Sequence, residues 1–559
     1  MNMPKLGRSF WFVTVNFALI LLCACTFLPS QARSANQESA ANTKFKIAGT
    51  VVNSVTGAPL GKARITLMDT ANRANMLSVI TGDDGHFEFH SLYRAKYSLQ
   101  GAKRGFISAA YEQHEQFSTA IVTGADFNTE NLVLRLTPLA FLSGKVIDES
   151  GELVRKARVW LYAENHQGGM QRIERRAADL TDDEGYYEFT ALGPGNYFVS
   201  VSAKPWYAFH LSPSAGSGGS SLPGVTALDV GYPTTYNNGA TDSQSATPLL
   251  LQAGDRVQVD IHLSPVPVVH LTIRVPEDQQ NRPPMPQLRR RVFDTVEPVA
   301  NEGVQSTAPG VYELSGVPAG KYSVVLPDSQ TGRLQQSSEI TLDKDGQELD
   351  VSHAEAMASV KLSVKVPRQS PGSQQVTIGL QDSRMRVISA NAIDAAGEVT
   401  LEGVPPGKYA LVAFSPDKRY SVVRTVFSGV ETSDHVLTLT AGSSLSGTVF
   451  LALGVVNVEG FVQRGGKPSS GVMVALIPKD PQSHLDMFRR DQSDTDGSFT
   501  LPAVIPGTYT LIAVEDAWGF QWIQPDVLNR YLRHGQNLTI GELMTNTVHL
   551  PDPIEVQPH

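Results

Sequence analysis

Residues 497–511 read GSFTLPAVIPGTYTL, and this stretch decides the fold. It opens on Gly497, and Tyr509 follows twelve residues later. Apolar side chains stand two, four and seven positions after the glycine, and again two positions after the tyrosine. Alternation with a period of two is typical of β-strands with one buried face, and a Pro-Gly pair between two such runs favours a tight connection. The stretch therefore predicts two β-strands joined by a short corner.

The same spacing occurs five times along the chain, and the glycine and tyrosine of each copy are Gly85 and Tyr97, Gly185 and Tyr197, Gly310 and Tyr322, Gly397 and Tyr409, and Gly497 and Tyr509. A repeat at fixed spacing indicates one structural unit used several times. Each copy offers about seven short strands with turn signals between them and almost no helical period, a pattern that two packed sheets would bury. The sequence predicts an all-β fold, a tandem array of about five small antiparallel β-sandwich modules arranged in a row.

The first copy also carries a family resemblance, through Gly49-Thr50-Val51, Ala63-Arg64-Ile65-Thr66-Leu67, Gly85-His86-Phe87-Glu88-Phe89 and Tyr97-Ser98-Leu99. This arrangement resembles the carboxypeptidase regulatory-like domain, one of the transthyretin-like or carbohydrate-binding-like β-sandwiches. The resemblance is good over 45–137, 138–265 and 445–550. It is partial over 266–355 and 356–444, where Pro309-Gly310 and Ala396-Gly397 replace an aspartate-bearing turn. Such a resemblance is specific for the fold and weakly informative about function.

The N-terminal segment has the pattern of an export signal. Lys5 and Arg8 precede an apolar stretch from Phe10 to Leu28, and Ser30-Gln31-Ala32 offers small residues for cleavage, which predicts a signal peptide over 1–32. Alternatively, Leu22-Cys23-Ala24-Cys25 resembles a lipobox, in which Cys25 would carry lipid and tether the protein to a membrane. We expect an exported protein that is extracellular, periplasmic or associated with an outer membrane, with no transmembrane span in the mature chain.

The composition argues against several classes of function. The formal net charge of −9 and the pI near 5.8 disfavour nucleic acid as a partner, since a basic face would be expected. Both cysteines of the chain, Cys23 and Cys25, lie in the N-terminal segment, so the mature modules are expected to lack disulfides and thiolate chemistry.

No catalytic pattern emerges from the repeat. Zinc carboxypeptidases accompany domains of the family that the sequence resembles, yet the histidine spacings of a zinc peptidase are missing. Asp491, Asp494 and Asp496 suggest a calcium loop at first, but Gln492 and Ala503 stand where ligands belong, so a turn is the simpler interpretation. We therefore expect no enzyme activity, no cofactor and no metal site.

Two aromatic clusters interrupt the repeat and are candidate carbohydrate-binding sites. The first lies in a long insertion, 204–246, and contains Trp206 and Tyr207. The second follows the last repeat strand and comprises Trp518, Phe520, Trp522 and Tyr531. Exposed aromatic rings next to polar groups form platforms on which sugar rings stack, whereas in the alternative interpretation these side chains close the ends of the sandwich.

The sequence thus predicts a non-catalytic exported scaffold, with carbohydrate binding as the leading molecular function. Its partners would be a polysaccharide or cell-surface glycan, or else envelope proteins. The alternatives are a structural stalk or protein-interaction array, which would be an elongated particle, and a regulatory partner of a peptidase.

Overall fold

The computed structural model describes residues 44–208, 228–275, 285–299, 304–327, 334–351, 355–367, 376–432, 435–519 and 521–559. Strands dominate it, and the predicted all-β fold is confirmed. The strands form ten sheets, which pair into five sandwiches, each with its own apolar core. The expected signal peptide and Cys25 lie outside the described residues.

The strands of the first two modules follow the repeat. Module 1 consists of β1 (Phe45–Asn53), β2 (Arg64–Asp69), β3 (Met76–Ile80), β4 (His86–Leu92), β5 (Lys96–Ala102), β6 (Ala109–Ala110), β7 (Ile121–Val122) and β8 (Leu132–Leu136). Module 2 consists of β9 (Ala140–Ile147), β10 (Arg158–Asn165), β11 (Arg172–Leu180), β12 (Tyr186–Leu192), β13 (Gly195–Ser202), β15 (Thr235–Tyr236), β16 (Leu249–Leu251), β17 (Arg256–Gln258) and β18 (Ile261–His262).

The other three modules vary the same plan. Module 3 consists of β14 (Val230–Gly231), β19 (Val266–Arg274), β20 (Gln287–Val292), β21 (Thr295–Pro298), β22 (Val304–Ala308), β23 (Val311–Pro318), β24 (Gly320–Pro327), β25 (Leu334–Leu342), β26 (Gln347–Asp350) and β27 (Glu355–Ala356). Module 4 consists of β28 (Ala358–Lys365), β29 (Thr377–Gln381), β30 (Val387–Ala392), β31 (Glu398–Val404), β32 (Gly407–Phe414), β33 (Tyr420–Phe427), β34 (Val430–Thr432), β35 (Val436–Leu439) and β36 (Ser444–Leu453). Module 5 consists of β37 (Val456–Arg464), β38 (Lys467–Pro468), β39 (Met473–Pro478), β40 (Arg489–Gln492), β41 (Ser498–Val504), β42 (Gly507–Val514), α2 (Pro525–Leu532), β43 (Gln536–Ile540), β44 (Val548–His549) and β45 (Ile554–Glu555).

The sheets are mainly, but not purely, antiparallel. In module 1 the first strand, β1, pairs antiparallel with β4 and parallel with the last strand, β8. The same parallel pairing joins β9 to β17 and β18, β19 to β26, β28 to β36, and β37 to β44 and β45. A parallel neighbour requires a crossover, so a strand at or near the end of each module returns from the opposite sheet to close the sandwich beside the long N-terminal strand.

This closing strand moves two of the expected boundaries. The sequence assigns residues from 445 onward to the fifth unit, but β36 pairs parallel with β28 and antiparallel with β33, both in module 4. Module 5 begins at Val456, and its last strand, β45, lies after residue 550, where the sequence places the end of the unit. The insertion in module 2 also crosses a boundary, because its β14 pairs with β19 of module 3.

The first glycine of each repeat copy, at 85, 185, 310, 397 and 497, is called the marker glycine. In three of the modules a hydroxyl fixes the polar turn that precedes it. The hydroxyls of Thr81, Thr181 and Ser493 each accept a hydrogen bond from a backbone N–H at the start of the neighbouring strand, and each donates to a carbonyl upstream. The marker glycines themselves have φ between 65° and 80°, a left-handed conformation that favours glycine. The turn needs a hydroxyl that both accepts and donates, followed by a glycine with positive φ, and this need explains why the motif recurs.

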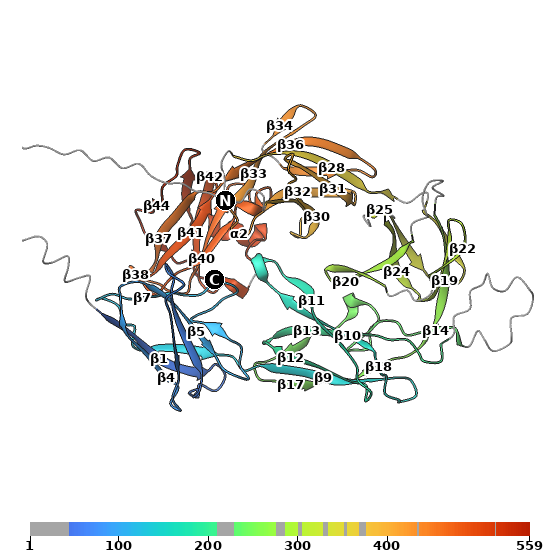
Figure 1. Cartoon of the computed structure of the whole chain (residues 1–559), viewed down its shortest axis with the longest axis horizontal. Coiled ribbons are helices and arrows are strands. Elements are labelled where there is room, and N and C mark those ends of the chain that lie inside the picture. Colours follow the sequence, from blue (N-terminus) through green and yellow to red (C-terminus); the bar gives the residue numbers. More distant parts are fainter. Residues whose placement is uncertain are drawn as a thin grey trace, which may run out of the picture.

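The five modules close into a ring, which the expected row of modules does not describe. Figure 1 shows module 1, in blue, lying against module 5, in red. Direct contacts join them, such as the Lys96 ammonium and the Asp494 carboxylate at 2.6 Å. Hydrogen bonds or strand contacts also join each consecutive pair of modules, so the elongated row that the stalk alternative expects is not the arrangement of this structure.

Candidate functional site

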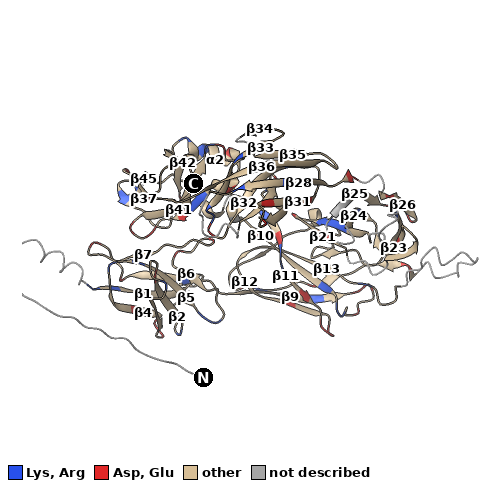
Figure 2. Ribbon diagram, turned by 45° about the horizontal axis from the view of Figure 1, so that its top comes forward, with Lys and Arg blue, Asp and Glu red and all other residues tan. Residues whose placement is uncertain are grey.

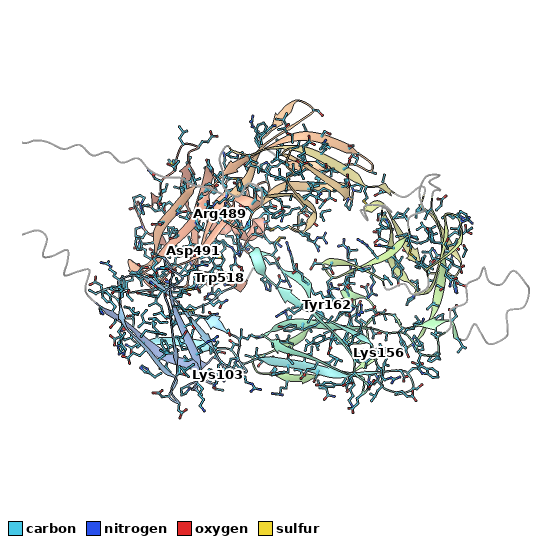
Figure 3. All side chains as sticks on the ribbon, viewed as in Figure 1. Lys103, Lys156, Tyr162, Arg489, Asp491 and Trp518 are labelled. Atoms are coloured by element: carbon cyan, nitrogen blue, oxygen red, sulfur yellow. The ribbon has the colours of Figure 1, made fainter. Side chains whose placement is uncertain are left out.

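Trp518 and Trp522 lie at the junction of several modules. Trp518 belongs to a single helical turn, Ala517–Gly519, that follows β42, and the two indoles are only 8% and 3% exposed. They form an apolar cluster with Phe117 of module 1, Met170 of module 2 and Met385 of module 4. Figure 3 shows Trp518 at the border between modules 1 and 5. The two indoles therefore lie in a buried apolar contact between modules.

The expectation that this cluster forms an exposed sugar platform is therefore wrong for Trp518 and Trp522. The His114 imidazole of module 1 already stacks on Trp518, with ring centroids 5.4 Å apart and planes 6° from parallel. The Arg490 guanidinium lies 5.0 Å from the centre of the Trp522 ring. Tyr531, in α2, is half-buried against the same cluster, and Phe520 lies outside the described residues. Stacking partners from the protein take the place that a sugar ring would need.

The other predicted cluster is exposed. The Trp206 side chain, after β13, is 85% exposed and meets the Tyr207 ring edge-on, with centroids 5.7 Å apart. The hydroxyls of Tyr207 and Tyr232 both donate to the Glu149 carboxylate. Burial opposes ionisation of Glu149, but hydrogen bonds from Tyr207, from its own backbone N–H and from Tyr232 hold its pKa below the ordinary value. The result is a fixed carboxylate and tyrosine beside a free indole face.

The contact between modules 1 and 5 is polar and well enclosed. The Arg490 guanidinium of β40 bonds the Glu115 carboxylate at 2.9 Å, and these two side chains are only 10% and 11% exposed. Two backbone groups extend the pairing: Thr495 donates its N–H to the Ala120 carbonyl at 3.0 Å, and Ala120 donates its N–H to the Asp494 carboxylate at 2.8 Å. Asp494, in the turn that suggests a calcium loop in the sequence, thus joins the two modules.

Asp486 is buried where module 5 meets module 4. One of its carboxylate oxygens accepts from the backbone N–H groups of Ala413 and Val422 at 3.4 and 3.2 Å. Nearby, the Arg489 guanidinium donates to four backbone carbonyls, including that of Lys418 in module 4. Burial raises the pKa of Asp486 to about 6, although hydrogen bonds oppose the shift.

This shift predicts how stability depends on pH. A carboxyl whose pKa is higher in the folded than in the unfolded protein holds its proton more tightly when folded, so its contribution to stability falls as the pH rises from about 4 to about 6. Asp486→Asn removes the charge, and we expect it to raise the free energy of unfolding at pH 7 by up to about 3 kcal/mol, with little change at pH 4. Urea denaturation of the two proteins at both pH values tests this. A variant that is less stable at pH 7 would contradict it.

Charges of both signs are interspersed over all five modules (Figure 2). Within the described ranges, no group of three or more His, Cys, Asp or Glu side chains is placed to hold a metal ion. No helix in the part of the chain that the structure describes is long and apolar enough to cross a membrane.

Comparison with known families bears out the resemblance in the first two modules. The sequence model of the carboxypeptidase regulatory-like domain matches residues 46–135 and 142–213. Residues 450–532, in the region of module 5, match instead the second β-sandwich domain of BOS complex subunits of the NOMO1-like kind. No curated protein sequence matches the chain.

Several solved structures are similar to parts of the chain. A streptococcal ancillary pilin is 13% identical, with 55% of this chain and 98% of the pilin covered, at a TM-score of 0.20. A minor pilin of Streptococcus agalactiae is 12% identical, with 40% and 96% covered, at 0.20. Two B repeat units of the collagen-binding protein of Staphylococcus aureus are 12% identical, with 73% and 100% covered, at 0.12. At such scores the similarities carry no argument about function.

Proposed function

We propose that this protein is a non-catalytic scaffold that acts outside the cytoplasm and binds carbohydrate through the surface formed by Trp206 and Tyr207. The observation that carries the proposal is the 85% exposure of the Trp206 side chain. An indole left in water costs free energy that burial against a ligand would recover, and its flat face suits the C–H face of a sugar ring.

The neighbours of Trp206 support a saccharide as the ligand. The Tyr207 ring lies at right angles to the indole, so the two rings form two perpendicular faces that a ligand could contact together. The Glu149 carboxylate is held by the hydroxyls of Tyr207 and Tyr232. A carboxylate has about four lone-pair sites, and the two hydroxyls with the backbone N–H of Glu149 leave capacity to accept from a sugar hydroxyl. Aromatic surface with a fixed acceptor beside it is a common composition for polar ligand sites.

Removal of the indole tests the proposal. We expect the purified protein to be retained on at least one insoluble polysaccharide, and Trp206→Ala to weaken that binding by about tenfold, since a lost aromatic contact is worth roughly 1 kcal/mol or more. Thermal unfolding should not change, because the side chain is exposed. Tyr93→Ala is the matched control, as Tyr93 is an aromatic residue of module 1 that is 61% exposed. Failure to bind any polysaccharide, or binding that Trp206→Ala leaves intact, would contradict the proposal.

A protein-interaction scaffold is the second candidate, and one observation favours it. β3 is the edge strand of its sheet, and it exposes Met76, Leu77 and Ile80 at 62%, 49% and 64%. An apolar edge strand with unpaired backbone groups is a template for pairing with another protein. The same retention assay with envelope proteins in place of polysaccharides distinguishes the two candidates.

A further inference from the structure

A polar cavity lies where four modules meet near the centre of the ring. Its volume is about 300 Å³, and its walls come from the segment before and at the start of β11, the turn after β20, the turn after β29, and the segment before α2. In Figure 1 the start of β11 lies beside α2, with β20 and β30 nearby. Cavities at domain interfaces are frequent ligand sites, and this volume is at the lower end of their usual range. It would suit a small ligand.

Arginine side chains dominate the charge of this cavity. Arg172, Arg384 and Arg386 line it together with one acid, Asp294. The Asp294 carboxylate is already used, since one oxygen accepts from the Arg384 guanidinium at 2.8 Å and the other from the Ile173 backbone N–H at 3.0 Å. The Arg386 guanidinium is bound to the adjacent carboxylate of Asp382 at 2.6 Å. Two of the three cations therefore have close acidic partners.

Arg172 is the exception. One of its terminal nitrogens donates to the neutral carbonyl of Arg384. Its ion pair with Glu174 is loose, at 3.7 Å, and the Glu174 side chain is 47% exposed, where water screens the interaction. The Nε of Arg172 is buried without an acceptor in the described part of the chain. That atom is enclosed and does not face the cavity, so an anionic ligand would bind Nη1 of Arg172, whose acidic partner Glu174 is distant and screened by water.

The rest of the lining provides groups that suit hydroxyls. Three glutamine side chains form a chain in which Gln524 donates to Gln521 at 2.5 Å and Gln521 donates to Gln171 at 2.8 Å. This leaves the amide nitrogen of Gln171 and the amide oxygen of Gln524 at its two ends to bond a ligand. Met170 and Ile173 add apolar surface against which the C–H face of a sugar ring can pack.

We propose that this cavity binds a saccharide that carries a carboxylate, such as a hexuronic acid residue. Arg172 binds the carboxylate, the ends of the glutamine chain bind hydroxyls, and Met170 and Ile173 support the ring. The site is separate from Trp206, so it stands whether or not the aromatic surface binds glycans. Its ligand also bridges modules 2 and 5, which provide Arg172 and Gln524.

Isothermal titration calorimetry of the full mature chain with galacturonic acid and its trimer tests the proposal. We expect one site per chain, no heat with galactose, and none with inorganic phosphate at the same concentration. Arg172→Gln should weaken binding at least about tenfold, because a hydrogen bond to a charged group is lost. Arg176→Gln is the matched control, since Arg176 is an exposed arginine on β11 that does not line the cavity.

Further measurements distinguish the loss of the ligand site from the loss of the ring of modules. Arg172 also bonds module 4, so small-angle scattering must show that its variant retains the ring, and Gln524→Ala tests the lining without a change of charge. We expect Gln524→Ala to weaken the binding of galacturonic acid and Trp206→Ala to leave it unchanged. Equal binding of galactose, equal binding of phosphate, no binding of any uronic acid, or full binding by both cavity variants would each overturn the proposal.

Discussion

Replacing Tyr509 with alanine is expected to lower the free energy of unfolding of module 5 by about 3–5 kcal/mol, the usual effect of truncating a large core aromatic residue. The Tyr509 side chain is 1% exposed and packs inside the core of module 5. Urea denaturation followed through tryptophan fluorescence measures the change, with Trp160 and Trp206 of module 2 replaced by phenylalanine in both proteins so that Trp518 and Trp522 of module 5 are observed. A loss under about 0.5 kcal/mol, the range of surface substitutions, would show that the ring does not support the core.

The hydroxyl of Tyr509 explains why the marker is tyrosine and not phenylalanine. It donates to the Ile505 carbonyl, four residues earlier, at 2.7 Å. The same bond to the residue four positions earlier occurs in the other four modules, from Tyr97, Tyr197, Tyr322 and Tyr409, at 2.8–3.2 Å. It ties each corner to the strand that follows. Tyr509→Phe keeps the packing and loses this bond, so we expect a cost of about 1 kcal/mol, clearly less than that of alanine.

The glycine two positions before the tyrosine belongs to the same device. A Cβ at Gly320, Gly407 or Gly507 would lie 3.2, 2.8 or 3.4 Å from the nearest atom of its own module's tyrosine. In these three modules the ring folds back over the corner and leaves little room for a side chain, whereas a Cβ at Gly195 of module 2 would lie 3.8 Å from the Tyr197 ring and module 1 has Ala95 at this position. In modules 3, 4 and 5 the glycine of the tight corner therefore also makes room for the aromatic ring.

Much of the fold could be predicted because it depends on sequence patterns that are local to each module. The period of two, the turn with Thr81 or Thr181 and the glycine-tyrosine spacing each act within one module. The crossover strand β36 was assigned to the wrong module because its apolar alternation is the same whichever neighbour it pairs with. Periodicity identifies a strand but does not determine which other strand it pairs with.

The candidate sites were harder to predict because they depend on contacts between modules. Trp518 and Trp522 stand in a stretch whose composition is equally typical of an exposed platform and of an interface, and only the ring decides between them. Arg172 and Gln524 are ordinary polar residues more than 350 positions apart, and no motif links them. One signal was available: β40 has polar or charged residues at every position from Arg489 to Gln492, and such a strand lacks the apolar alternation that a sandwich core requires, which indicates polar contacts with a neighbouring module.

Arg490→Glu is expected to open the ring between modules 1 and 5. The substitution places a second carboxylate beside Glu115 in a contact where the native side chains are 10% and 11% exposed. Loss of one partner from a buried ion pair costs roughly 3–5 kcal/mol, because the other charge stays buried without compensation. The two modules are joined to the rest of the ring by their other neighbours, so this contact can separate while every sandwich stays folded.

Distances between spin labels at Val55 and Leu543 measure the opening. Both residues are well exposed, one in each module, and the chain has cysteines only at 23 and 25, so labelling sites can be introduced without interference from the modules. We expect one narrow distance distribution in the native protein and a longer, broad one in Arg490→Glu, with a larger radius of gyration in solution scattering. The double variant Glu115→Arg with Arg490→Glu restores opposite charges and should recover much of the closed form. Lys361→Glu breaks an exposed ion pair with Glu398 in module 4 and should leave the distance unchanged. An unaltered distribution in Arg490→Glu would mean that apolar contacts around Trp518 hold the ring without this pair.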